Sequence, residues 1–323
     1  MKALLLAVVL VAACQGVAVG PTKPPNELLF VSGPQNQVSA YEASDGSPAG
    51  PLPAGAFDAT LTGGGDLDEA YVAGDDLNLY RVRAGRPLRV DRLDAIRGAG
   101  PYQVALVPAP RLTNFVGART VLVVKGADGS LFGYQAGRQL WREGVPQDAQ
   151  LLRVDSVAVI GYAGAWSLIA PENGREVPLA SDCPDAPLAE VRGAVVFDCA
   201  GTTPPAATLN LPAGPAYDLR PVRREESVLA YPSGDWFRID PGPRLAGQGH
   251  GPGGEGRPGL SPDGGTLYWP GSVSAASVAV SRDGNFLYAL GTGGLRVLAA
   301  ADRKEIANYR SVTGTDILLV SGG

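Results

Sequence analysis

The sequence predicts an all-β protein, and three observations lead to this fold class. After residue 26 the chain consists of short runs rich in Val, Leu and Tyr. Gly (44) and Pro (28) are unusually frequent among the 323 residues, and they fall between these runs, where they mark turns. No long segment after residue 26 shows the 3.6-residue spacing of an amphipathic helix. With 45% hydrophobic residues, such a chain can bury a sizeable core.

A hairpin pattern repeats along the chain. The pattern G-x-D-x-x-L-(Y/F)-x-x-x-A-G-R-x-L begins at Gly74 and again 52 residues later at Gly126. We interpret each copy as a turn, an alternating strand, a glycine turn and a second strand, which together form a β-hairpin with one buried face.

Weaker copies indicate how many units the chain holds. They lie at residues 38–46, 166–175, 236–242 and 295–303, and a further hairpin is expected around residues 208–214, giving seven. Additional apolar runs, such as residues 120–124 and 277–281, precede several hairpins, so that each unit has four strands. Four strands per unit, at intervals of about 40 residues, are typical of a β-propeller. We therefore expect one propeller domain over residues 27–323 with seven four-stranded blades, although six or eight blades would also fit.

The ends of the domain fit the same plan, whereas one internal segment does not. Residues 317–322 form a lone strand after the last hairpin, and the unit that starts at residues 28–33 is one strand short. We expect these two segments to pair within one blade and close the ring, which removes exposed edges. The segments Ser261–Tyr268 and Ser281–Tyr288 repeat only 20 residues apart, which is half a blade. One of them is therefore expected to belong to a truncated or inserted unit.

These repeats resemble those of known propeller families. Residues 261–268 and 281–288 look like the S-x-D-G-x-x-L-Y strand–turn–strand of YVTN-type and TolB-type propellers. Residues 126–141, which end Gly-Arg-Gln-Leu-Trp, are similar to the repeat of pyrroloquinoline-quinone-type propellers. Both resemblances imply the blade fold over most of the chain. The repeat residues make turns and blade interfaces, so they say little about function.

The N-terminus has the pattern of an export signal. Lys2 precedes an apolar run at residues 3–10, and small residues at 11–13 stand before Cys14. Val-Ala-Ala-Cys at 11–14 resembles the bacterial lipobox, in which the thiol receives a diacylglycerol group and the chain is cleaved before it. The resemblance implies a signal peptide over residues 1–13, a lipidated tether over 14–26 carrying palmitate-type acyl chains, and membrane attachment without a spanning segment, which would need about 20 apolar residues. An ordinary secretory signal with an incidental cysteine is the alternative.

The other two cysteines fit an oxidising compartment. A disulfide between Cys183 and Cys199 would close a loop of about 17 residues and contribute on the order of 3 kcal/mol. Two buried free thiols are the alternative, and a metal site is disfavoured because the chain has no C-x-x-C motif and a single histidine.

Few side chains point to chemistry. The lone His250 lies in a Gly-rich segment that suggests a surface loop, and no G-x-S-x-G motif accompanies it. Asp66, Asp68 and Glu69 are weak candidates for calcium ligands, because they lack the spacing of an EF-hand loop. The four Trp residues are expected to pack between blades, so no cofactor is predicted. A net charge of −5 makes nucleic acid an unfavourable partner.

Together these features predict a non-catalytic, lipid-anchored propeller in the extracytoplasmic cell envelope. We expect it to act as a binding scaffold for a protein, peptide or glycan, as the resemblance to bacterial lipoprotein propellers of the quinone-repeat type implies. Gln15 is not the Asp that favours inner-membrane retention, so the outer membrane is preferred by the same analogy. The alternative is a lactonase-like hydrolase with calcium in the central channel. The hydrolase should have acidic side chains that converge at the channel, whereas the binding scaffold should have an apolar, aromatic patch on one face.

Overall fold

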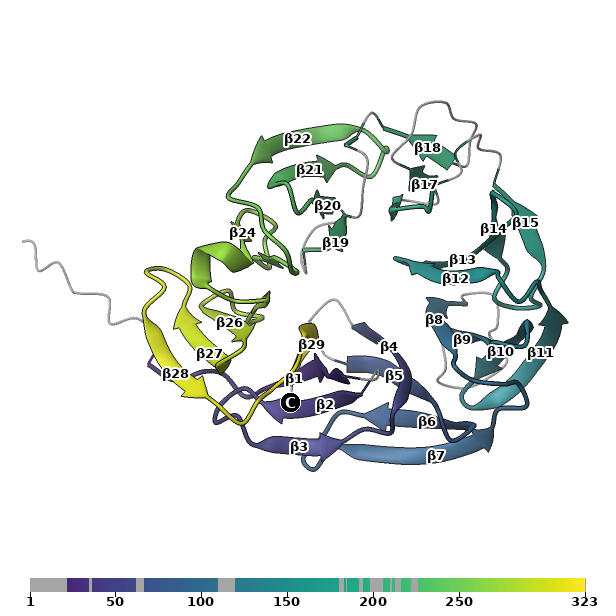
Figure 1. The fold of residues 1–323 in the computed structure, drawn as a ribbon, viewed down its shortest axis with the longest axis horizontal. Coiled ribbons are helices and arrows are strands. Elements are labelled where there is room, and N and C mark those ends of the chain that lie inside the picture. Colours follow the sequence, from purple (N-terminus) through teal and green to yellow (C-terminus); the bar gives the residue numbers. More distant parts are fainter. Residues whose placement is uncertain are drawn as a thin grey trace, which may run out of the picture.

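The strands surround a central channel in a computed structural model of the chain (Figure 1). It describes residues 22–34, 37–61, 67–109, 120–179, 183, 185–191, 194–197, 206–209, 211–212, 216–221 and 226–322. These residues contain no α-helix, and therefore no helix among them could cross a bilayer. The all-β prediction is confirmed.

The described strands form eight sheets that follow one another in chain order around the ring (Figure 1). Six of them have four strands. The first sheet contains β29 (Asp316–Gly322), β1 (Glu27–Ser32), β2 (Val38–Glu42) and β3 (Pro48–Pro51). The second contains β4 (Gly55–Leu61), β5 (Leu67–Gly74), β6 (Asn78–Arg83) and β7 (Arg89–Ala95). The third contains β8 (Gln103–Pro108), β9 (Thr120–Lys125), β10 (Ser130–Gln135) and β11 (Arg138–Gly144).

The remaining four-stranded sheets come later in the chain. One contains β12 (Gln150–Val154), β13 (Val157–Tyr162), β14 (Ala165–Ile169) and β15 (Glu176–Pro178). The next contains β19 (Tyr217–Leu219), β20 (Ser227–Ala230), β21 (Asp235–Ile239) and β22 (Leu245–His250). The last contains β25 (Ser277–Val280), β26 (Phe286–Gly291), β27 (Gly294–Ala299) and β28 (Glu305–Tyr309).

Two sheets are smaller, and they correct the predicted blade count. β16 (Ala189–Val191), β17 (Ala194–Phe197) and β18 (Ala206–Thr208) form a three-stranded sheet, in which β18 runs parallel to β17. The hairpin expected around residues 208–214 lies partly outside the described residues, and the described residues 209, 211 and 212 belong to no strand. β23 (Gly259–Leu260) and β24 (Leu267–Tyr268) form a two-stranded sheet. The prediction of seven four-stranded blades is therefore wrong, and six are present among the described residues.

The two clear copies of the repeat form equivalent hairpins in adjacent blades. The first copy covers β6 and the start of β7, and the second covers β10 and β11; both strand pairs are antiparallel. The four weaker copies lie at β2–β3, β14–β15, β21–β22 and β27–β28, which also pair antiparallel. These six predicted hairpins are confirmed.

The two S-x-D-G segments make the same turn in two different settings. Ser261 Oγ donates to Asp263 and accepts the N–H of Thr266, and Ser281 makes the equivalent bonds with Asp283 and Phe286. The first turn joins β23 to β24, and the second joins β25 to β26. The truncated unit expected here is therefore the two-stranded sheet β23–β24, which we call the half-blade.

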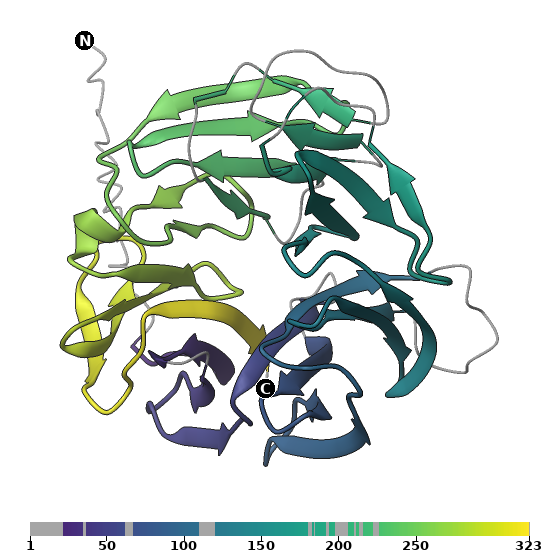
Figure 2. The ribbon, with the colours of Figure 1, turned by 45° about the vertical axis from the view of Figure 1, so that its right-hand side comes forward.

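The first and last described strands lie in one sheet. β29 pairs antiparallel with β1, with Leu29 opposite Val320 and Phe30 opposite Leu319. The oblique view in Figure 2 shows the yellow β29 against the purple strands of the first sheet.

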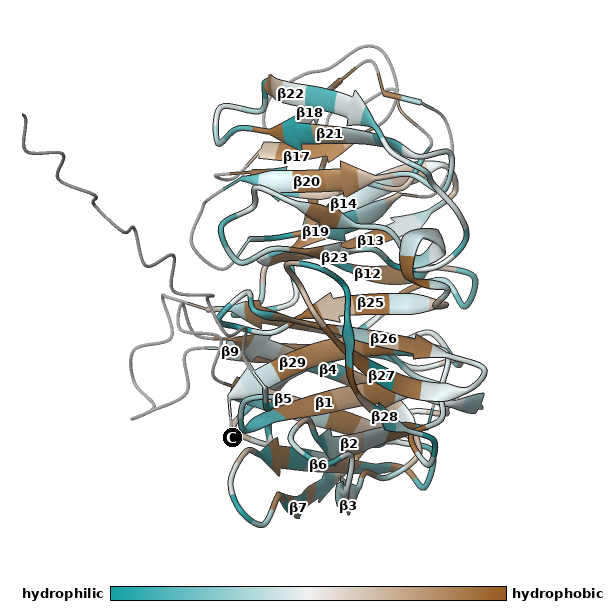
Figure 3. Cartoon of the chain, turned by 90° about the vertical axis from the view of Figure 1, so that its left-hand side faces the viewer, coloured by the Kyte–Doolittle hydropathy of each residue, from teal (hydrophilic) through white to brown (hydrophobic). Residues whose placement is uncertain are grey.

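The core consists of separate clusters between neighbouring sheets. Val123, Leu131 and Ile160, for example, join the third and fourth sheets. Strands covered on both faces are buried along their whole length, as β9 and β10 are, whereas no residue of the outermost β7 and β22 is buried. Figure 3 shows the same contrast, with β1 and β29 largely brown. This arrangement has two places for ligands, which are the central channel and a recess between neighbouring sheets.

Candidate functional site

The residues predicted for lipidation and disulfide formation are mostly outside the described part of the chain. Cys14 and Cys199 both lie outside the described residues, so lipidation and the Cys183–Cys199 bridge stay predictions. Cys183 is buried, at 3% exposure, beside Trp166 and Leu179. A mass measurement of the peptides on either side, with and without reductant, checks the bridge.

The acidic candidates for a metal do not come together among the described residues. Asp66 lies outside them. Asp68 and Glu69 are neighbours on β5 and so point to opposite faces of the strand. Burial, followed by the charge of Asp68, raises the pKa of Glu69 to about 7, and Tyr71 Oη lies 3.4 Å from its carboxylate. No group of three or more His, Cys, Asp and Glu side chains in the described part is arranged to hold a metal.

His250 is the last residue of β22, so the surface-loop prediction is wrong. Its Nδ1 lies 2.9 Å from Asp235 Oδ1 on the neighbouring strand, and its side chain is 69% exposed. The hydrogen bond from His250 lowers the pKa of Asp235. The pair is a surface contact between the two outer strands of this blade.

A cavity of about 720 Å³ occupies the centre of the ring. It is bounded by innermost strands, which are β4, β12, β19 and β29 (Figure 1). Its charged lining residues are three carboxylic acids and three arginines: Asp58, Asp155, Asp218, Arg153, Arg220 and Arg257. These side chains come from three sheets and from the segment before β23, so the channel gathers charges that are far apart in sequence.

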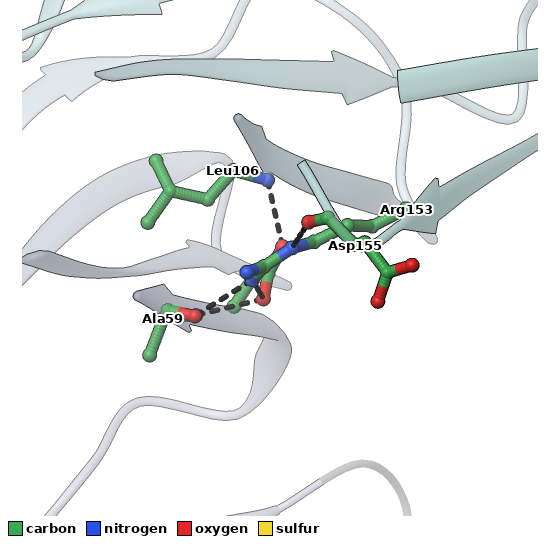
Figure 4. Close-up of polar contacts among 5 residues, drawn as sticks. Ala59, Leu106, Arg153 and Asp155 are labelled. Carbon is green, nitrogen blue, oxygen red and sulfur yellow. Dashed lines mark hydrogen bonds and ion pairs between the residues drawn. The ribbon is translucent and has the colours of Figure 1, made fainter. Parts of the chain in front are cut away.

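Arg153 links two blades across the channel (Figure 4). Its guanidinium lies 2.6 Å from Asp58 Oδ1 and donates to the carbonyls of Ala59, at 2.6 Å, and Asp155, at 2.8 Å. Asp58 also accepts the N–H of Leu106 at 2.6 Å. Burial raises the pKa of Asp58, and Arg153 opposes that rise. Asp58 and Ala59 belong to β4, Leu106 belongs to β8, and Arg153 and Asp155 belong to β12 and the turn after it, so this cluster connects three successive blades.

A second cluster contains two carboxyl groups in contact. Arg220 pairs with Asp155 and donates to the carbonyl of Glu190, while Asp155 accepts the N–H of Glu190 at 2.6 Å. Asp218 is hydrogen-bonded to Asp155, and burial together with the Asp155 charge raises the pKa of Asp218 well above its usual range. Two adjacent carboxylates share one proton because like charges this close cannot both ionise without a large cost. Burial beside Asp155 thus favours the protonated form of Asp218, and the channel holds three arginines beside its three acids.

The second candidate site is a cavity of about 340 Å³ beside the half-blade, which we call the β24 groove. Its volume is at the lower end of the range for ligand pockets, about 300–1,000 Å³. It is lined by Val228, Trp236, Arg238, His250, Gly251, Pro252, Leu260, Gly264, Gly265, Thr266, Leu267, Trp269, Ser272 and Arg303. Two indole rings and several aliphatic side chains make most of this lining apolar.

Glycines place the two indole rings. Trp236 on β21 lies opposite Gly249 on β22, where a Cβ would come within 2.6 Å of the indole. The Trp269 ring lies in the same way over Gly251. Trp166 covers Gly161 in a complete blade, and Trp141 covers Gly174. The prediction that the four Trp residues pack against blades is confirmed, but only Trp236 and Trp269 also line a cavity.

Sequence reasoning missed both cavities. The arginines and acids of the channel belong to different repeats, and none stands in a recognisable motif. A charge inside an apolar run, as at Arg153 between Leu152 and Val154, is the signal that could have identified them. For the groove the signal is the alternation of Gly247, Gly249 and Gly251, which removes side chains from one face of β22.

Comparisons with known proteins identify no family. No protein-family model matches the chain, and no curated protein matches it either. Similar solved structures include the β-propeller domain of Cps50 (Swd1) from Myceliophteria thermophila, at 9% identity and a TM-score of 0.44 over 80% of this chain and 87% of that one.

Two further structures are similar over most of the chain. Sqt1 of Saccharomyces cerevisiae is 9% identical, with a TM-score of 0.35 over 86% of this chain and 69% of that one. BamB from Moraxella catarrhalis is 12% identical, with a TM-score of 0.32 over 88% and 76%. Scores this low carry no argument about function, and the propeller assignment rests on the sheet topology described above.

Proposed function

We propose that this chain is a lipid-anchored, extracytoplasmic β-propeller that binds a partner and does not catalyse a reaction. In this proposal Cys14 carries the lipid, pairing of β1 with β29 closes the ring, and the resemblance of the repeats to YVTN-, TolB- and quinone-type propellers reflects the shared blade. The partner is a protein, peptide or glycan, and the membrane is the outer one.

The β24 groove is the observation that carries this proposal. An apolar, aromatic recess on a rigid scaffold is the arrangement expected of a binding module, because buried aromatic anchors contribute most of the free energy of association. The groove requires no motion to form, since Trp236 and Trp269 are already held by glycines on β22 and just after it.

The charges of the channel favour binding over the lactonase alternative. A calcium site needs several oxygen ligands with net negative charge. Here Arg153 pairs with Asp58, Arg220 pairs with Asp155, and burial beside Asp155 raises the pKa of Asp218. Two of the three carboxylates are thus engaged by arginines, and Arg257 adds a further positive charge, which disfavours a divalent cation.

Crosslinking in intact membranes tests the proposal. The wild-type protein and Cys14→Ser are crosslinked under identical conditions, and captured partners are compared. We expect one discrete partner with the anchored form and its loss with Cys14→Ser. Labelling with a palmitate analogue should mark only the wild type. Failure of both forms to capture a specific partner would contradict the scaffold role, as would turnover of lactone or ester substrates that depends on added calcium.

A further inference from the structure

The half-blade lacks the two outer strands that six other sheets possess. After β24 the chain does not turn back to form a third strand; it passes through the 3₁₀ turn η2 (Pro270–Val273) and enters β25. Among the described residues β24 has a partner on one side only, which is β23. The position of a third strand is thus unfilled by the neighbouring chain.

The open edge of β24 presents backbone groups. Ser261 N–H donates to the Thr266 carbonyl at 2.9 Å, so these two residues form a hydrogen-bonded position of the ladder. Hydrogen-bonded and non-hydrogen-bonded positions alternate in an antiparallel ladder. Leu260 and Leu267 form the next pair, so Leu267 directs its N–H and C=O away from β23. An incoming strand would find a donor and an acceptor at this residue.

The β24 groove lies where the third strand would be. On one side Leu267 and Trp269 pack with Trp236 of the preceding blade. On the other side Tyr268 packs with Val278 and Leu298 of the following blade. The lining includes Trp236 and Arg238 of β21, the third strand of one flanking blade, and Arg303 from the turn after β27, the third strand of the other. A strand in this space would therefore meet Trp236 and Leu267 as an apolar wall, and Arg303 from the following blade.

The geometry and charge of the groove limit what can occupy it. Arg296 on β27 donates to the carbonyls of Val273 and Ser274, and this contact fixes the end of the η2 segment. The volume of about 340 Å³ admits only a short segment. The charged lining side chains include Arg238 and Arg303, and no carboxylate is among the lining residues. Glu226 lies 3.5 Å from Arg238 Nε, so Arg303 is the main attraction for an acidic group.

We propose that the β24 groove receives a short extended segment of a partner protein, with alternating apolar side chains and one acidic residue, which adds to β24 as a third strand. Backbone hydrogen bonds to Leu267 provide affinity, and the apolar wall selects alternate side chains. This inference rests on the proposed binding function and names the surface and the mode of binding.

The test uses random heptapeptides displayed on phage and panned against the purified Cys14→Ser protein. We expect enriched sequences with apolar, β-branched or aromatic residues at alternate positions and an acidic residue. The most enriched peptide is synthesised, and its affinity is measured by fluorescence anisotropy. N-methylation of its amides, one at a time, should weaken binding about tenfold at every second position and leave the intervening positions unchanged, since only one edge faces β24.

Two variants of the protein locate the binding. Leu267→Pro removes the outward N–H without removing a bond to β23, and it should weaken the peptide about tenfold. Trp236→Ala should weaken it about 30-fold, as expected for an aromatic anchor. The matched control is Trp166→Ala, which removes a ring from over a glycine in a complete blade and should leave peptide affinity unchanged. Thermal unfolding of each variant checks its fold, and the N-methylated peptides need no variant at all.

Several outcomes would overturn the inference. They are the absence of enrichment, equal binding to Trp236→Ala, and N-methylation effects without a period of two. Sedimentation that shows a dimer lost in Leu267→Pro would instead make a second copy of this chain the occupant. If any of these results occurs while the membrane crosslinking still captures a partner, the proposed function stands and only this binding mode fails.

Discussion

Replacing Glu27 with Ala should destabilise the protein strongly, because Glu27 ties the first strand to the last four-stranded blade. The residue begins β1 and is only 3% exposed. One carboxylate oxygen accepts the hydroxyl of Tyr288 at 2.6 Å, and the other accepts the N–H of Arg282 at 2.8 Å. Tyr288 is fully buried on β26, so solvent cannot replace the carboxylate.

The magnitude follows from the two groups left behind. Each buried polar group that loses its only acceptor costs about 1–3 kcal/mol, so we expect the free energy of unfolding to fall by about 2–6 kcal/mol. Urea unfolding followed by Trp fluorescence measures this change. The control is Glu42→Ala on the adjacent strand, where Glu42 pairs with a half-exposed Arg86 at 2.8 Å. That variant should lose less than about 1 kcal/mol.

The pH dependence of stability checks the same contact. Burial raises the pKa of Glu27 above its unfolded value, although the bonds from Tyr288 and Arg282 oppose that rise. The protonated side chain therefore contributes stability below the unfolded pKa, and this contribution is lost as pH rises through the folded pKa. Glu27→Gln should lack that part of the pH dependence. A loss below about 1 kcal/mol in Glu27→Ala, or an unchanged pH profile in Glu27→Gln, would refute the reasoning.

Three other changes test the channel and the blade interfaces. Arg153→Met leaves the Asp58 carboxylate without its cation and should cost about 3 kcal/mol in urea unfolding, with Asp58→Asn/Arg153→Met less destabilised than the single variant. Asp218→Asn mimics the protonated acid. The raised pKa of Asp218 makes the stability of the wild type fall as pH rises, so the melting temperature of the variant should depend less on pH between pH 5 and 8. Gly161→Ala places a Cβ 2.6 Å from the Trp166 ring and should cost about 1–3 kcal/mol by urea unfolding.

Local sequence was enough to locate most hairpins. The copies that begin at Gly74 and Gly126 carry their own turn residues and alternating apolar positions, so each hairpin is specified within about 20 residues. The same reasoning identified the truncated unit, because the Ser261 and Ser281 turns lie too close for a full blade between them. It failed at β18, since a parallel partner is chosen by the surrounding sheets and leaves no turn signature.

Local sequence did not identify the residues of the candidate sites. His250 stands out by its rarity, and the acids at 66–69 stand out by their clustering, yet none of the described residues among them lines the central channel. Asp58, Arg153 and Asp155 are unremarkable in the sequence, and they meet because β4 and β12 both border the channel. No single repeat contains a signal for this contact.

By itself the sequence determined the all-β class, the positions of six hairpins and the turns that define them, because period-two alternation and Gly or Asp at turns act within a few residues. The tertiary structure alone decided the number of complete blades, the raised pKa of Asp218 and the gap beside β24. Each of these depends on which sheets become neighbours when the ring forms. Burial, charge pairing and an unfilled strand position arise only between segments that are distant in the chain.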